Sequence, residues 1–223
     1  EILTELSLDP DFDTQARGIL ESGITVAAVA LLHSHRNPVH ELALRDHLLS
    51  LGFTHVSTSA ELAPLVKILP RLETALANAT LQPVMQAFVD HHRERFSDGS
   101  RLLMMTSAGG LEPMEQFRPK DSLLSGPAGG VSGAAAIAEE LGFSRVLTFD
   151  MGGTSTDVAR YDDGFQYDFE QRVGDARVLA PALRIETVAA GGGSICRWEN
   201  GGLRVGPESA GAAPGPASYG RGG

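Results

Sequence analysis

The segment FDMGGTSTDVARY, residues 149–161, restricts the fold of this chain more than any other part of its sequence. It joins two runs, RVLTFD at residues 145–150 and STDVARY at residues 155–161, which are rich in β-branched and aromatic residues and therefore favour strands. The turn between them contains Gly152 and Gly153, which put no side chain between the backbone N–H groups and a ligand. We predict an antiparallel hairpin with an open glycine turn.

Carboxylates and hydroxyls on either side of this turn favour one kind of ligand. Backbone amides that converge in a glycine turn can cradle an anion, and the hydroxyls of Thr154, Ser155 and Thr156 add donors. Asp150 and Asp157 would repel a bare phosphate, but Mg²⁺ seeks oxygen ligands and bridges phosphates. The sequence thus predicts a site for phosphate and Mg²⁺. The alternative is an ordinary glycine hairpin with exposed acids.

The segment SGPAGGVSGAAAIAEELG, residues 125–142, predicts a helix with Ser125 or Gly126 as its amino-terminal cap, Pro127 near its first position and a stop at Gly142. Small residues along it allow close approach to another backbone or to a ligand, and the positive amino-terminal end favours an anion. A tight helix–helix crossing and a phosphate contact both remain open.

The preceding part of the chain has an α/β pattern. The apolar run at residues 24–32 predicts a central strand with helices on both faces, and residues 37–52 and 55–58 predict a helix and a parallel strand. Residues 70–96 predict a long helix that Pro83 kinks or divides, and residues 101–107 predict a buried strand. Because 20 of the 26 glycines lie after residue 120, we place a boundary near Asp121.

Composition excludes several classes of partner. The formal net charge of −10 argues against nucleic acid and anionic membranes, which require basic surface. No apolar run approaches the roughly 20 residues that span a bilayer, and residues 1–20 lack a signal pattern, so we expect a cytoplasmic location. We expect Cys196, the single cysteine, to pack rather than to act as a nucleophile.

Other possible sites are less favoured. His33, His35 and His40 lie close together in sequence, but no cysteine joins them, and we favour ordinary loop and helix positions over a metal site. No segment matches a P-loop or the GxGxxG pattern of dinucleotide-binding folds. Ser194 lies outside a GxSxG elbow, so we do not assign it as a nucleophile.

Two glycine-rich segments follow. GGGSI, residues 191–195, either approaches the nucleotide through Gly192 and Gly193 or simply turns the chain. Residues 206–223 are too rich in glycine and proline for regular structure, and we expect an ordered loop over the site or at a subunit contact.

Five segments, in this order, resemble the hydantoinase A, 5-oxoprolinase and acetone carboxylase family. They are LLHSHRNPVHE (31–41), LLSGPAGGVSGA (123–134), FDMGGTSTDV (149–158), AAGGGSI (189–195) and VGPESAGAAPGPASYGRGG (205–223). The hairpin also resembles the second phosphate-binding hairpin of the actin, sugar-kinase and Hsp70 superfamily, and the preceding helix resembles that superfamily's connecting helix. The resemblance implies a partial two-lobed, ribonuclease-H-like α/β architecture of the actin/Hsp70 type. Residues 1–121 would end the first lobe, and residues 122–223 would begin the second.

The resemblance also implies an activity, in which ATP phosphorylates the carbonyl oxygen of a cyclic amide before water opens the ring. Carried onto this chain, Gly152, Gly153 and Thr154 hold the terminal phosphates. Asp150 orients Mg²⁺ or its water, with Asp157 in support, and these two are the candidate catalytic residues. The further candidate nucleotide contacts are Ser155, Thr156, Gly192 and Gly193.

Departures from the family pattern leave alternatives open. Ser218 stands where relatives often have cysteine, and ILPRLETALANA at residues 68–79 fits the expected arginine–threonine–asparagine helix only loosely. The chain opens on Glu1 without methionine, so we expect a piece of a longer polypeptide, truncated at both ends, that lacks the first phosphate hairpin and the adenosine site. The exact substrate lies beyond the sequence, whereas the resemblance implies a hydantoinase B-like second subunit or fused domain as a partner. An ATP-dependent ketone carboxylase subunit and a non-catalytic Hsp70-like nucleotide-binding module are the alternatives.

Overall fold

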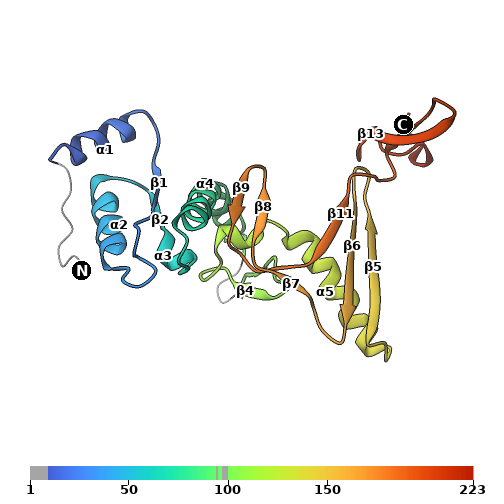
Figure 1. Ribbon diagram of the computed structural model, residues 1–223, viewed down its shortest axis with the longest axis horizontal. Helices are drawn as coiled ribbons and strands as arrows, with labels where there is room; N and C mark the ends of the chain where they lie inside the picture. The colour runs from blue at the N-terminus through green and yellow to red at the C-terminus, as the bar shows by residue number, and fades with distance from the viewer. Residues whose placement is uncertain (1–9, 94, 97–99, 223) are drawn as a thin grey trace. The chain divides into compact units, whose positions relative to one another are not determined.

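The computed structural model describes residues 10–93, 95–96 and 100–222, which form two compact units (Figure 1). Of these described residues, unit 1 contains those between 10 and 104, 112–123 and 169–181, and unit 2 contains 105–111, 124–168 and 182–222. The chain therefore passes from one unit to the other several times. One of these passages, between Leu123 and Leu124, lies near the boundary predicted at Asp121, but the assignment of the two parts to two ATPase lobes stays a prediction.

Unit 1 combines helices with two small sheets. Its elements are α1 (Phe12–Glu21), β1 (Val26–Val29), α2 (Val39–Leu51), β2 (His55–Thr58), α3 (Ser59–Leu62), α4 (Ile68–Arg93), the 3₁₀ helix η1 (Pro119–Ser122), β8 (Gln171–Val173) and β9 (Ala176–Val178). The hairpin of β3 (Leu103–Met105) and β4 (Leu111–Pro113) contains residues of both units.

The predicted β-α-β unit is confirmed, because β1 and β2 pair in parallel around α2, which ends at the left-handed Gly52. One face of this pair packs on α1 and α2. Its core consists of Ala16, Val29, Leu48, Phe53 and Val56. On the other face, Ser57 accepts a hydrogen bond from Asn78 of α4 (3.0 Å), so helices cover both faces.

The long helix α4 continues through Pro83, so division at this residue, one of the two predicted effects of the proline, is wrong, and a kink there stays a prediction. Proline removes one backbone donor, yet packing on either side of it holds the helix together, with Asn78 and Val89 both buried. Asn78 Oδ1 also accepts the N–H of Lys120 (3.1 Å), which ties the helix to η1.

Unit 2 is mostly β structure around one helix. Its elements are α5 (Ser125–Glu140), β5 (Arg145–Met151), β6 (Thr156–Asp162), β7 (Tyr167–Asp168), β10 (Ala182–Leu183), β11 (Ile185–Val188), β12 (Ser194–Glu199), β13 (Gly202–Ser209) and the 3₁₀ helix η2 (Ala217–Tyr219). β5, β6 and β11 form an antiparallel sheet in the order β11-β6-β5, which confirms the predicted hairpin. In Figure 1, α5 runs alongside this sheet, and its small residues pack against it through Ala128 and Val131.

Several sequence predictions require correction. The expected central strand at residues 24–32 is limited to β1, which pairs only with β2 among the described residues, so it is not central in a larger sheet. β3 is partly exposed rather than buried, with Leu103 facing solvent. The helix α5 is preceded by Leu124 as its cap residue, not by Ser125 or Gly126. Residues 206–209, expected to lack regular structure, belong to β13. None of the described helices combines the length and apolar character needed to cross a membrane.

Candidate functional site

The β5–β6 hairpin places the two predicted acids face to face. Asp150 of β5 is the direct cross-strand partner of Asp157 of β6. Directly opposed residues of an antiparallel pair have Cβ atoms only about 4.5–5.5 Å apart, and like charges in such positions destabilise a sheet. The two carboxylates are therefore close enough to act on one ligand.

Both acids line a pocket of about 490 Å³ between α5 and the hairpin. Its other walls are Pro127, Gly130, Val131 and Ala134 of α5, and Val146, Leu147, Thr148 and Phe149 of β5. A Cβ atom added to Gly130 would lie 4.0 Å from Oδ2 of Asp150, so the glycine-rich helix passes close to this carboxylate. The small residues of α5 thus lie against the sheet and the acid. Among the described residues of unit 2, they do not form a helix–helix crossing, because α5 is its one α-helix.

No basic group neutralises either acid. Across the described part of the chain, no lysine, arginine or histidine nitrogen forms an ion pair with Asp150 or Asp157. Asp157 Oδ1 accepts a hydrogen bond from the hydroxyl of Thr187 (2.6 Å), which carries no charge. The negative charge of the two opposed carboxylates is therefore not compensated by a cationic side chain of the described residues.

The turn of the hairpin leaves three backbone donors open. The N–H of Gly152 donates to the carbonyl of Ser155 (2.9 Å) and is therefore used inside the turn. Among the described residues, the N–H groups of Gly153, Thr154 and Ser155 donate no hydrogen bond to a backbone or side-chain acceptor. These successive amides remain available for an anion.

The predicted glycine contacts Gly192 and Gly193 bind the turn itself. The N–H of Gly192 donates to the carbonyl of Gly152 (2.9 Å), and that of Gly193 donates to the carbonyl of Gly153 (2.8 Å). Their amides are therefore occupied within the protein, and the segment buttresses the hairpin turn.

Close backbone packing explains why this region needs glycine. A Cβ atom at Gly153 would lie 2.3 Å from the carbonyl oxygen of Gly211, and one at Gly193 would lie 2.6 Å from the same oxygen. A Cβ atom at Gly191 would lie 2.7 Å from the carbonyl oxygen of Gly152. Real side chains do not tolerate such distances, so three glycine segments, around residues 152–153, 191–193 and 209–211, pack backbone to backbone. The loop that follows β13 therefore does contact the candidate site, as one of the two sequence alternatives expected.

The hydroxyls of the turn are not equivalent. Thr156 is buried, and its Oγ1 donates to the carbonyl of Ala190 (2.6 Å), so this hydroxyl holds the turn to the following segment. Thr154 is exposed and Ser155 half-buried. The hydroxyls that remain available to a ligand are those of Thr154 and Ser155.

The acids fit a magnesium ion that brings its own further ligands. Carboxylate oxygens suit Mg²⁺, which is usually held by one or two protein carboxylates, several waters and phosphate oxygens. The described residues contain no group of three or more histidine, cysteine, aspartate or glutamate side chains arranged to hold a metal. The pair Asp150 and Asp157 therefore matches a phosphate-bound Mg²⁺ better than an ion held by protein alone.

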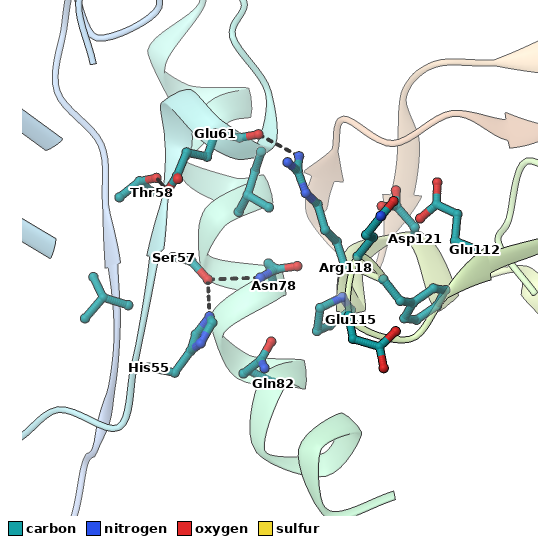
Figure 2. A pocket seen from close by; sticks show the side chains of 15 residues that line it. His55, Ser57, Thr58, Glu61, Asn78, Gln82, Glu112, Glu115, Arg118 and Asp121 are labelled. Atoms are coloured by element: carbon teal, nitrogen blue, oxygen red, sulfur yellow. Dashed lines mark hydrogen bonds between the residues drawn. The ribbon is translucent and has the colours of Figure 1, made fainter. Parts of the chain in front are cut away.

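A second pocket, of about 680 Å³, lies within unit 1 (Figure 2). His55 and Asn78 both hydrogen bond to the hydroxyl of Ser57, at 3.1 and 3.0 Å, and these groups lie at the end of β2 and on α4. Burial lowers the pKa of His55 below its ordinary value of 6.5, because desolvation disfavours the charged imidazole. Most carboxylates of this pocket already pair within the protein. These pairs are Glu61 with Arg45, Glu115 with Arg93, and Asp121 with Lys120.

Unit 1 also contains a buried polar cluster that the sequence analysis missed. Arg71 and Glu41 are both fully buried, 3.8 Å apart, and Arg71 donates to the carbonyls of Leu31 and Leu32. Arg71, Thr74 and Asn78 recur on one face of α4, and this helical spacing was the available signal in the segment described as a loose fit. Cys196 is exposed on β12, so the expectation that it packs against other residues of the chain is wrong.

These features fit one family of ATP-using enzymes. Residues 71–223 match the hydantoinase/oxoprolinase family, and the chain belongs to this family. The resemblance inferred from the five sequence segments is thereby confirmed.

Named relatives agree with this assignment. The chain is 43% identical to 5-oxoprolinase 1 of Arabidopsis thaliana over 211 residues, which are 93% of this chain and 17% of the relative. It is 42% identical to 5-oxoprolinase of Saccharomyces cerevisiae, over 96% of this chain and 17% of the relative. It is also 34% identical to caprolactamase subunit alpha of Pseudomonas jessenii, over 91% of this chain and 30% of that protein.

Solved structures support the fold. The crystal structure of the ATP-dependent caprolactamase from Pseudomonas jessenii matches with a TM-score of 0.81 and 31% identity, over 100% of this chain and 34% of that one. A nucleotide-free acetone carboxylase, an enzyme of ATP-dependent acetone carboxylation, matches with a TM-score of 0.69 and 27% identity, over 90% of this chain and 30% of that one. The chain thus has a mixed α/β fold of this family and corresponds to a part of each relative.

Proposed function

We propose that this chain supplies the phosphate- and metal-binding hairpin of an ATP-dependent cyclic-amide hydrolase of the 5-oxoprolinase type. The carrying observation is the pair of unneutralised, directly opposed carboxylates, Asp150 and Asp157, next to three open backbone amides. The sequence similarity to two 5-oxoprolinases and to a caprolactamase supports a cyclic amide as the substrate. The structural similarity to enzymes described as ATP-dependent supports ATP as the co-substrate.

In this proposal, neutral backbone amides bind the phosphates and the negatively charged carboxylates bind the metal. The N–H groups of Gly153, Thr154 and Ser155 bind phosphate oxygens, while Gly152, Gly192 and Gly193 shape the turn through the hydrogen bonds they already make. Asp150 and Asp157 hold Mg²⁺ or its bound water. When bound, Mg²⁺ neutralises charge on the phosphates during transfer, the main requirement of phosphoryl transfer.

The consequence for the substrate is an activated amide carbonyl carbon. Transfer of the terminal phosphoryl group to the amide carbonyl oxygen breaks its bond to the leaving ADP and forms a carbonyl O–P bond. Water then adds to the activated carbon, and the ring C–N bond breaks as the nitrogen takes up a proton. A second water hydrolyses the resulting acyl phosphate to the free carboxylate and inorganic phosphate. The hairpin acts on the first of these steps, because it contacts the phosphates rather than the amide.

Partners and location complete the proposal. One relative is named as subunit alpha, which supports a hydantoinase B-like second subunit or fused domain. The cytoplasmic location rests on the sequence alone. The acetone carboxylase structure favours a second candidate, an ATP-dependent ketone carboxylase subunit, which matches at lower identity and TM-score.

The test is substitution of the acids in the complete protein that contains this chain. We expect Asp150→Asn and Asp157→Asn each to lower ATP turnover stimulated by 5-oxoproline by about 100-fold or more, because each removes a charge that the metal requires. ADP release measures this turnover. Asp163→Asn is the matched control, since Asp163 lies on the same chain segment outside the pocket and asparagine tolerates its left-handed backbone (φ 51°).

Each outcome decides between the candidates. Unchanged turnover in Asp150→Asn contradicts the hairpin assignment. Turnover stimulated by acetone with bicarbonate, but not by 5-oxoproline, would assign the chain to a carboxylase instead.

A further inference from the structure

We propose that Thr187 is a positioning residue that fixes the carboxylate of Asp157 for the metal, an inference that rests on the proposed function of the hairpin. Asp157 of β6 has two direct cross-strand partners. Thr187 of β11 lies on one side of it, and Asp150 of β5 lies on the other. The three side chains therefore form one row across three strands. Neighbours in such a row are close enough for side-chain contact.

A neighbouring row of residues fixes this alignment. Ile185, Ala159 and Thr148 are likewise direct partners across β11, β6 and β5. Ala159 is buried, and Ile185 packs on the apolar cluster beneath α5. Side chains alternate between the two faces of a strand, so residues two positions apart lie on the same face. The row of Thr187, Asp157 and Asp150 therefore lies on the same face of the sheet as the row that packs in the core. Packing of one row thus sets the geometry of the other.

The hydrogen bond of Thr187 orients one oxygen of the acid. Its Oγ1 donates to Asp157 Oδ1 at 2.6 Å, and no other side-chain hydrogen bond or ion pair to Asp150 or Asp157 occurs in the part of the chain that the structure describes. The β-branched side chain of threonine has restricted χ1 freedom, so the hydroxyl is held in place before a ligand arrives. Oδ2 of Asp157 is left for a cation.

A hydroxyl is suited to this position because it has no charge. A lysine or arginine opposite Asp157 would orient the carboxylate but would also neutralise it and compete with Mg²⁺. Residues that hydrogen bond to metal ligands typically change metal affinity or activity by about 10- to 100-fold when they are removed. Thr187 acts through Asp157 and need not touch the nucleotide.

The experiment measures metal binding directly, in the complete protein with a non-hydrolysable ATP analogue. Mn²⁺ replaces Mg²⁺ as the probe, and the electron paramagnetic resonance signal of free Mn²⁺ gives its affinity. We expect Thr187→Val to lower this affinity by about 10- to 100-fold and Thr187→Ser, which keeps the hydroxyl, to stay close to the parent protein. The Mg²⁺ concentration for half-maximal ATP turnover should rise in parallel in the valine variant.

Thr54→Val is the matched control. The hydroxyl of Thr54 also bonds across to a neighbouring segment, at Thr25, but belongs to unit 1 and to neither acid. If Thr187→Val fails to fold by circular dichroism, Thr187→Ala removes the same hydroxyl and takes its place.

The possible results separate this inference from the proposed function. Unchanged Mn²⁺ affinity in Thr187→Val, together with weakened affinity in Asp157→Asn, overturns the role of Thr187 and keeps the hairpin site. Unchanged affinity in Asp150→Asn and Asp157→Asn overturns both. Equal loss in the valine and serine variants also overturns the inference, because it would show that the shape of the side chain matters and the hydroxyl does not.

Discussion

At the scale of single residues, the candidate site depends on glycines, because a Cβ atom at these positions would collide with a neighbouring backbone. The carbonyl oxygens of Gly152, Gly153 and Gly211 lie where side chains of neighbouring segments would otherwise extend. This packing holds the turn in one shape through contacts between backbone atoms. The glycines therefore serve structure first, and ligand access follows from it.

Gly153→Ala tests this view. The added methyl group would lie 2.3 Å from a backbone oxygen of Gly211, which has little freedom to move, so we expect a loss of about 1–3 kcal/mol in the free energy of unfolding. Thermal unfolding of the parent and variant proteins measures the effect. Gly164→Ala is the control, because no atom lies within 4 Å of its added Cβ atom. Equal melting temperatures for the two variants would contradict the packing argument.

Sequence reasoning identified the acids at this scale but not their partners. The pattern of Asp150, two glycines and Asp157 is local, so a reader of the sequence can place all of it on one hairpin. Thr187 lies 30 residues further along the chain, and only the strand register brings it to Asp157. Likewise, the contact of Gly193 with Gly153 depends on a loop path that no local pattern specifies.

At the scale of secondary-structure elements, the buried pair Arg71 and Glu41 joins α4 to α2. Glu41 accepts hydrogen bonds from the backbone of Leu31 and Ala60 and from the hydroxyl of Ser59, and Arg71 also donates to Ser59 (2.8 Å). A buried charge is expensive without its partner. The pair thus couples two helices to the ends of both parallel strands.

Breaking this pair should destabilise unit 1 strongly. We expect Arg71→Ala to cost about 3–5 kcal/mol, because it leaves Glu41 buried and uncompensated. Arg45→Ala removes an arginine from a partly exposed pair with Glu61 and should cost at most about 1 kcal/mol. Urea unfolding followed by circular dichroism compares the two variants. A cost for Arg71→Ala no greater than that for Arg45→Ala would refute the role of the buried pair.

Elements with strong local signals were predictable, and those set by distant contacts were not. The β5–β6 hairpin, α2 and its glycine end were predicted because turn residues and apolar periodicity lie within one short window. The long helix α4 was predicted, but its continuity at Pro83 was left open, because a proline normally ends or kinks a helix, and here packing outweighs the lost hydrogen bond. β13 was missed because its glycine and proline content resembles that of a loop.

At the scale of the whole molecule, the chain contains one candidate phosphate-binding turn and corresponds to about one sixth of the length of the 5-oxoprolinases that it matches. Tight nucleotide binding requires contacts to adenosine as well as to phosphates. The open amides and the carboxylate pair supply contacts to the phosphates only.

We therefore expect the purified 223-residue chain to hydrolyse no ATP above the rate in buffer. Phosphate release measures this rate, with the complete protein and 5-oxoproline as the positive control. Clear turnover by the chain alone would show that this hairpin needs no further phosphate site.

The repeated passage of the chain between its two units limits how the fold can be divided. Residues 169–181 leave unit 2 to place β8 and β9 in unit 1, where the N–H of Leu179 donates to Thr74 (2.8 Å) and that of Arg177 donates to Glu73. A gene fusion or recombination event with a single breakpoint near residue 124 would separate the β8–β9 hairpin from α4, the helix to which it is hydrogen bonded. The two units should accordingly be inherited together, and exchange between paralogues should be tolerated only when both are replaced at once.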